Sequence, residues 1–140
     1  MKAISLWQPW ASALMLGRGF KEHETRHWST TYRGLVAIHA AKRWTRDQVY
    51  AADELTRAGF SLDVLPRGCL LGWAVLEACV RTDALVPSLR DRVAGNWTPG
   101  RFAWRFGGHV LLAEPIPYNG AQGFFNVPDT VLRSAPEATP

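Results

Sequence analysis

Four residues near the amino terminus, Lys21, Glu24, Thr25 and Arg26, carry side chains that could act on a small polar substrate. A lysine in a partly desolvated pocket gives up its proton readily, so Lys21 could activate the Thr25 hydroxyl or a water molecule. Glu24 could take part in acid–base work or bind an exocyclic amine. In an extended chain alternate side chains share a face, which predicts Lys21 beside Thr25 and Glu24 beside Arg26. A solvated charge run remains the alternative on charge alone.

Two further polar residues interrupt apolar, strand-like runs. Glu77 closes the run 70–77, and a buried carboxylate there would have the raised pKa of an acid catalyst, whereas an exposed strand end would leave it in solvent. His39 lies within the run 36–41, where a histidine is usually a core residue with its hydrogen bonds satisfied. Trp7 and Trp28 are the indoles that we expect to stack on a base.

The hydrophobic pattern predicts the elements that must position these residues. We expect strands over 2–6, 34–41, 69–80, 102–106 and 110–114, a helix beginning at Pro9 and stopping near Gly17, and a second helix over 45–58. Thr45 and Gln48 form a capping box for the second helix, and Gly59 stops it. Several strands with two helices predict an α+β fold, a small, partly open β-barrel with flanking helices. Residues 1–133 form the domain, and the tail 134–140 is predicted to be disordered.

Composition narrows the classes of partner. The chain has 140 residues and a net charge of +4, and arginine supplies 13 of its 16 basic residues, which favours a phosphate-bearing partner modestly. Cys69 and Cys79 would lie too far apart on one strand to form a disulfide. No His/Cys cluster has zinc spacing, so no metal or other cofactor is expected. Without a signal peptide or a long apolar run, we expect a cytoplasmic protein with neither a membrane partner nor an obligate protein partner.

The charged stretch also carries a family signature. Gly19, Lys21, Glu24 and Arg26 match the pattern glycine-x-lysine-x-x-glutamate-x-arginine. With its flanks the chain resembles the ASCH domain family from about residue 2 to residue 128; these flanks are Ser5–Ala11, Arg33–Gly34, Ile38–Ala40, Gly95–Trp104, Glu114–Pro117 and Gly120–Gly123. The Glu24–Trp28 version looks closest to the branch of the endothelial-overexpressed lipopolysaccharide-associated factor.

The resemblance implies a PUA-like barrel that binds a small nucleoside or RNA. Some members are similar to amidohydrolases that remove the acetyl group from N(4)-acetylcytidine, using the signature lysine, a threonine at the sixth position of the signature and a glutamate further along. Here Glu24 stands at that sixth position, and Thr25 follows it. The hydrolase interpretation assigns catalysis and binding to two sets of residues. Catalysis falls to Lys21, Glu24, Thr25 and Glu77, and binding to Ser5, Trp7, Gln8, Pro9, Arg26, Trp28 and His39. A non-enzymatic RNA-binding module and a ribonuclease using the same cleft are the alternatives.

Overall fold

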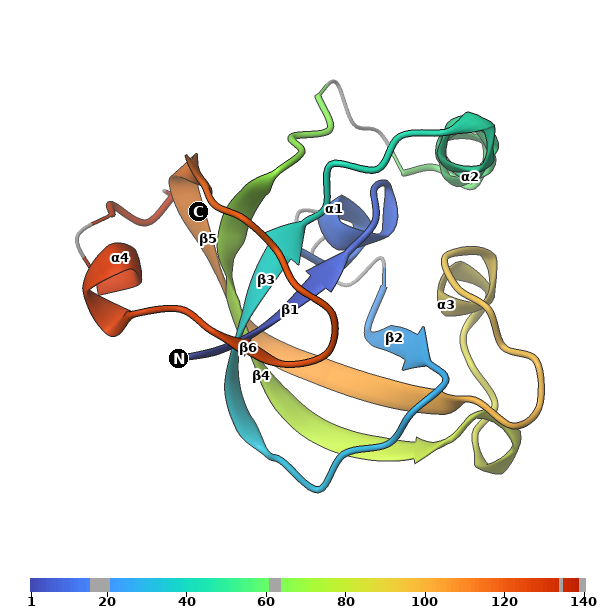
Figure 1. Ribbon diagram of the computed structural model, residues 1–140. Helices are drawn as coiled ribbons and strands as arrows, with labels where there is room; N and C mark the ends of the chain where they lie inside the picture. Colours follow the sequence, from blue (N-terminus) through green and yellow to red (C-terminus); the bar gives the residue numbers. More distant parts are fainter. Residues whose placement is uncertain (16–20, 61–63, 134, 139–140) are drawn as a thin grey trace.

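The computed structural model describes residues 1–15, 21–60, 64–133 and 135–138, and its centre is one strongly curved sheet (Figure 1). The strands are β1 (Lys2–Leu6), β2 (His23–Arg26), β3 (Gly34–Ala40), β4 (Cys69–Arg81), β5 (Phe102–Pro117) and β6 (Phe125–Asn126), in the order β2-β5-β4-β3-β1-β6. β1 and β3 are parallel, and every other pairing is antiparallel. Because β2 and β6 are edge strands, the barrel is not closed, which confirms the predicted α+β, partly open fold.

The helices are α1 (Trp10–Met15), α2 (Arg46–Arg57), α3 (Leu89–Val93) and α4 (Asp129–Arg133), with a 3₁₀ turn at Thr82–Ala84. The predicted capping box of α2 is present: the Thr45 N–H donates to Gln48 Oε1 at 2.6 Å. Gly59 follows the helix with φ +96°, a conformation that glycine adopts without strain. The predicted stop of the first helix, Gly17, lies outside the described residues.

The two strands predicted over 102–106 and 110–114 are one continuous strand, β5, paired along its length with β4. Three irregularities in the β4–β5 register absorb the residues that looked like a break between strands. At one of them Gly72 has φ +154°, and a Cβ there would collide with the Val110 carbonyl oxygen. A glycine therefore lets the two long strands approach and bend where a side chain would hold them apart.

Both faces of the sheet are covered. One face packs α1 against β1, β3 and β4, with Ile4, Leu14, Ile38 and Trp104 in its core. The other holds a smaller core that includes Leu70, Val127 and Leu132. Residues 36–40 of β3 are all buried, as their apolar run predicts.

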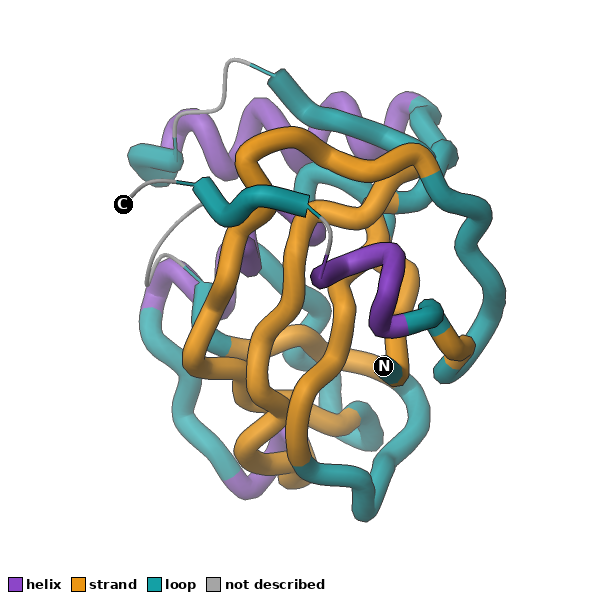
Figure 2. The backbone as a smooth tube through the Cα atoms, turned by 90° about the vertical axis from the view of Figure 1, so that its left-hand side faces the viewer, coloured by secondary structure: helices purple, strands orange, loops and turns teal. Residues whose placement is uncertain are grey.

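The carboxyl-terminal tail differs from the expectation of disorder. Ala138 N donates to Leu111 O at 2.7 Å, and Ala113 N donates to Pro136 O at 2.9 Å, so residues 135–138 lie along β5 (Figure 2). Cys69 and Cys79 are free. Within the described parts of the chain, no helix is both long and apolar enough to cross a membrane.

Candidate functional site

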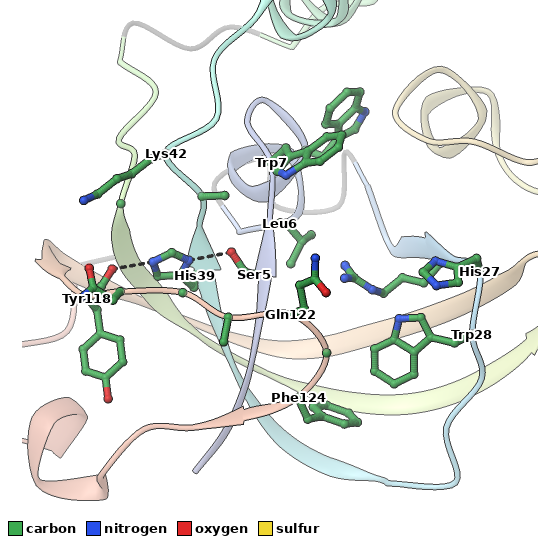
Figure 3. Close-up of a pocket in the computed structure, with 18 of the residues that line it drawn as sticks. Ser5, Leu6, Trp7, His27, Trp28, His39, Lys42, Tyr118, Gln122 and Phe124 are labelled. Carbon is green, nitrogen blue, oxygen red and sulfur yellow. Dashed lines mark hydrogen bonds between the residues drawn. The ribbon is translucent and has the colours of Figure 1, made fainter.

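A cavity of about 1070 Å³ opens where β1, β3 and the end of β2 meet the segment 118–124 that leads from β5 to β6 (Figure 3). The residues lining it are Ser5, Leu6, Trp7, Trp10, Thr25, Arg26, His27, Trp28, His39, Ala41, Lys42, Gly68, Arg101 and residues 118–124. Six of the residues predicted for the site line this cavity: Ser5, Trp7, Thr25, Arg26, Trp28 and His39.

Ser5 and His39 form a hydrogen-bonded pair on the cavity wall. They are partners in the β1–β3 ladder, and Ser5 Oγ lies 2.8 Å from His39 Nδ1. The other ring nitrogen, Nε2, lies 2.7 Å from the Tyr118 carbonyl oxygen. A carbonyl only accepts, so Nε2 carries the proton, and in the neutral ring Nδ1 accepts from the Ser5 hydroxyl. The serine hydroxyl thus points at the lone pair of an oriented imidazole.

The surroundings of His39 favour its neutral form. Burial lowers the pKa of His39 below its usual 6.5, the hydrogen bond to Tyr118 opposes that effect, and the charge of Lys42 adds to the lowering. A neutral imidazole can accept a proton near pH 7, which is what a general base must do.

Gly120 lies directly against this pair. A Cβ at this position would stand 2.7 Å from His39 Cε1 and Nδ1 and 2.9 Å from Ser5 Oγ. Only a residue without a side chain lets the 118–124 segment pass so close to the serine and histidine. The segment therefore forms one wall of the cavity.

The opposite wall is aromatic. The Trp28 ring meets Trp104 edge-on at 4.6 Å between centroids and Phe124 at 5.4 Å. Trp104 Nε1 donates to Trp28 O at 3.2 Å, which fixes the backbone at the same point. Arg26 places its guanidinium carbon 5.7 Å from the Trp28 ring centre. Trp28 is thus held rigidly while it remains part of the cavity surface.

The charged groups around the cavity are cationic. Arg26, Lys42 and Arg101 line it, and none of its lining residues among those the structure describes is an aspartate or glutamate. Arg101 Nη2 donates to Thr25 O at 2.8 Å, while its buried Nε has no hydrogen-bond partner within the described residues. The guanidinium therefore keeps unused donor capacity beside the cavity.

Lys21 and Glu24 lie outside the cavity lining. Lys21 Nζ is buried and donates to Glu24 Oε2 at 3.1 Å and to Ala94 O at 2.8 Å. The predicted alternation therefore does not apply: Lys21 precedes β2, so it contacts Glu24 rather than Thr25. This pair ties the start of β2 to the residue after α3.

Asp91, which sequence reasoning did not single out, fastens the same region. Its Oδ1 accepts from the Glu22 and His23 N–H groups at 2.9 and 3.0 Å, and its Oδ2 lies 3.1 Å from His23 Nδ1. Burial would raise the pKa of Asp91, but the hydrogen bonds from His23 and Glu22 outweigh it and lower that pKa. Carboxylate and imidazole atoms of Glu22, His23 and Asp91 lie within 4.8 Å of one another, but these hydrogen bonds already explain their grouping as a strand clamp.

Three other predicted site residues also lie away from the cavity lining. Gln8 is buried, and its side chain is taken up by Ser12 and the Pro66 carbonyl at 2.7 Å each. Pro9 is buried beside it. Glu77 is exposed, with Oε2 3.7 Å from Arg105 Nε, because its position near the end of β4 directs it to solvent.

Lys42, Arg101, Tyr118 and Gln122 line the cavity but were not predicted as site residues. The available signals were the Pro99–Gly100 turn before Arg101 and the glycines at 120 and 123. Those signals indicate a loop, but not which side chains the loop turns inward.

Comparisons with known proteins place this geometry in a wider group. Human activating signal cointegrator 1 is 31% identical over 122 residues, which cover 83% of this chain and 21% of that protein. The mouse protein of the same name is 39% identical over 83 residues, covering 55% of this chain and 14% of the relative. The chain thus spans about a fifth or less of the curated relatives it matches. These relatives do not support the narrower placement beside the endothelial-overexpressed lipopolysaccharide-associated factor.

Among solved structures, the crystal structure of ASCH from Zymomonas mobilis superposes with a TM-score of 0.55 at 18% identity, covering 94% of this chain and 90% of that one. A mutant form of the same Zymomonas mobilis protein gives a TM-score of 0.55 over 95% of this chain and 94% of that one. At this identity the likeness shows the PUA-like fold. Residues 4–99 match the model of the ASCH domain, and because that match covers more than half of the 140 residues, the chain belongs to the ASCH domain family.

Proposed function

We propose that the cavity binds a phosphate-bearing nucleoside unit of single-stranded RNA. The observation that carries the proposal is the charge of the lining: Arg26, Lys42 and Arg101 contribute to it, and its described residues include no carboxylate. An anionic ligand gains from three cations there and meets no opposing charge. Arginine also forms paired hydrogen bonds to phosphate oxygens.

The rest of the lining suits a base and a sugar. Trp28 presents a fixed indole, and Phe124 packs against it, so a planar base has a rigid surface to stack on. Asn119 and Gln122 offer amide groups that can donate to and accept from a base edge. A volume of about 1070 Å³ lies at the upper end of the range for small-molecule sites, about 300–1,000 Å³.

Binding of a cytidine monophosphate and of a short single-stranded RNA by the whole chain tests the proposal. Arg26→Gln and Lys42→Gln should each weaken binding about tenfold, the scale of a lost hydrogen bond to a charged group. Arg57→Gln is the matched control, because Arg57 lies at the far end of α2 and outside the lining. Failure of the wild-type chain to bind either ligand, or equal loss in all three variants, would overturn the proposal.

A second candidate is removal of an acyl group from the exocyclic amine of an N(4)-acetylcytidine-type substrate. The Ser5–His39 pair favours it, since a hydroxyl 2.8 Å from an imidazole nitrogen in a ligand-sized cavity is a nucleophile–base arrangement. Ser5 Oγ would attack the acyl carbon while His39 Nδ1 takes its proton. His39 would return the proton to the departing cytosine amine, and water would then hydrolyse the acyl-serine.

In this scheme the pair replaces Lys21 and Thr25 as the reacting groups. Mass spectrometry after incubation with N(4)-acetylcytidine tests it, with Ser5→Ala expected to abolish turnover and Thr25→Ser expected to retain it. An inactive wild-type chain, or a Ser5→Ala variant with full activity, would rule the hydrolase out. Cleavage of an RNA strand in the same assays would instead indicate a ribonuclease.

A further inference from the structure

Two exposed indoles near the cavity mouth each carry an arginine on one face. Trp7 is 48% exposed and Trp44 is 37% exposed. Arg43 Cζ lies 4.5 Å from the centre of the Trp7 ring, and Arg67 Cζ lies 5.4 Å from that of Trp44. Large aromatic side chains are costly to leave in water, so two of them beside one opening indicate a surface that is covered when a ligand is bound.

These four residues continue the cavity wall outward. Trp7 belongs to the lining, as do Lys42 and Gly68, which precede and follow members of the pairs along the chain. The two chain segments are fastened together, since Gly68 N donates to Ala40 O at 2.7 Å. Figure 3 shows Trp7 and Lys42 at the same end of the cavity, away from Trp28 and Phe124. We call Trp7, Arg43, Trp44 and Arg67 the arginine–tryptophan track.

The track is also strongly basic. Residues 41–46 contain Lys42, Arg43 and Arg46, residues 64–68 add Arg67, and neither stretch contains an acid. Within the described part of the chain, no carboxylate forms a salt bridge with Arg43 or Arg67. Their charges are therefore free to meet phosphates rather than being neutralised within the protein.

We propose that a single-stranded polynucleotide leaves the cavity across the arginine–tryptophan track, with a base stacked on Trp44 and backbone phosphates on Arg43 and Arg67. The inference rests on the proposed function and extends it from one nucleotide to a strand. A strand is required because unpaired bases expose the faces that stack on indoles, whereas duplex bases are already stacked on one another. The arginines already held over the rings supply a second planar surface beside the indoles.

The track has little to do in holding the fold, which makes it testable. Trp44 and Arg67 are exposed, and their contact is one that contributes weakly at a solvated site. Trp44→Ala should therefore leave the melting temperature and the circular dichroism spectrum unchanged. Tyr50→Ala is the matched control, because Tyr50 is a 60% exposed aromatic residue on α2 away from both pairs.

The experiment compares fluorescence anisotropy for cytidine monophosphate and for single-stranded RNA of about eight nucleotides, a length within the span that one small domain covers. The longer ligand should bind at least about tenfold more tightly, and Trp44→Ala should remove that advantage, since one stacked base accounts for about tenfold or more. Arg43→Gln combined with Arg67→Gln should lower the slope of log K against log salt by about 1.4, or roughly 0.7 for each phosphate. Tyr50→Ala and Arg57→Gln should change neither quantity.

The outcomes separate this inference from the proposed function. If both ligands bind equally and Trp44→Ala changes neither, the cavity still binds a nucleotide but the track is overturned. Duplex RNA that binds as tightly as the single strand would also overturn it. If no nucleotide ligand binds at all, the proposed function and the track fail together.

Discussion

Lys21 Nζ lies 3.1 Å from Glu24 Oε2, and the lysine side chain is wholly buried while the glutamate retains slight exposure. The ammonium also donates to Ala94 O, so its hydrogen bonds join β2 to the end of α3. A charge in such a place is expensive unless it is paired, and here it is paired. The most reactive-looking residue in the sequence therefore has a structural explanation, while the cavity is lined by Ser5 and His39 instead.

Replacing Lys21 should cost stability. Lys21→Met leaves the Glu24 carboxylate without its cation and the Ala94 carbonyl without its donor, so we expect a loss of about 3 kcal/mol of unfolding free energy. Urea denaturation measures it. Lys21→Met combined with Glu24→Leu should recover part of the loss, because the unpaired charge is gone. A single variant as stable as the wild type would contradict this account.

The buried His39 predicts a loss of stability in mild acid. Its pKa in the folded state is lower than its usual 6.5, so below that pH the unfolded chain binds the proton more readily. The free energy of unfolding should therefore fall as pH drops from 6.5 toward the folded-state pKa, by up to about 1.4 kcal/mol per pH unit. His109 acts in the same direction, so His39→Asn should reduce the slope without abolishing it. An unchanged slope in His39→Asn would show that this histidine is not the group responsible.

Gly120→Ala should disable the cavity while sparing the fold. The new methyl group would stand 2.7 Å from His39 Nδ1 and 2.9 Å from Ser5 Oγ, so either the segment or the pair must move. We expect nucleotide affinity to fall about tenfold or more and the NMR signal of the His39 ring nitrogens to shift, on the scale of a lost hydrogen bond to a charged group. Gly95→Ala is the control, since its nearest new contact is 3.3 Å from Trp97 Nε1 and outside the cavity lining. Wild-type affinity in Gly120→Ala would mean that this wall yields freely.

Gly72→Ala should destabilise the long β4–β5 pairing. Its φ of +154° is unfavourable for other residues, and the added Cβ would meet the Val110 carbonyl. We expect about 2 kcal/mol or more of lost stability, since overpacking adds to backbone strain. Gly59→Ala isolates the strain alone, because φ is +96° there and nothing lies within 4 Å of the new atom. Equal melting temperatures for the two variants would remove the collision from the explanation.

Local pattern predicted much of the fold. β1, β3, β4 and α2 follow from hydrophobic runs and from the capping residues Thr45 and Gln48, because those signals depend on neighbours in the chain. The continuity of β5 through Gly107 and Gly108 did not follow, since the long partner strand β4 sustains it through register shifts. The tail at 135–138 gains its order in the same way, from β5.

The candidate site was predictable only in part. Ser5, Trp7 and His39 stood out by residue type, and all three line the cavity. The roles of Lys21 and Glu24 depended on Ala94, a partner 73 residues away from Lys21 along the chain, which no local spacing reveals. Lys42 and Arg101 are ordinary basic residues in the sequence, and only the tertiary fold turns them toward one space.

The walls of the cavity come from opposite ends of the sequence, because Gly120 closes against Ser5 and His39. Such contacts form only after a large loop has closed, a step that slows folding compared with the capping of α2. Tryptophan emission from Trp28 reports on this late assembly, while helical circular dichroism reports on early, local order. Any nucleotide held between these walls binds the folded chain alone, so it should stabilise the fold by RT ln(1 + [L]/Kd) and raise the melting temperature accordingly. A domain whose binding surface is the last part to assemble would release its ligand as the first step of unfolding.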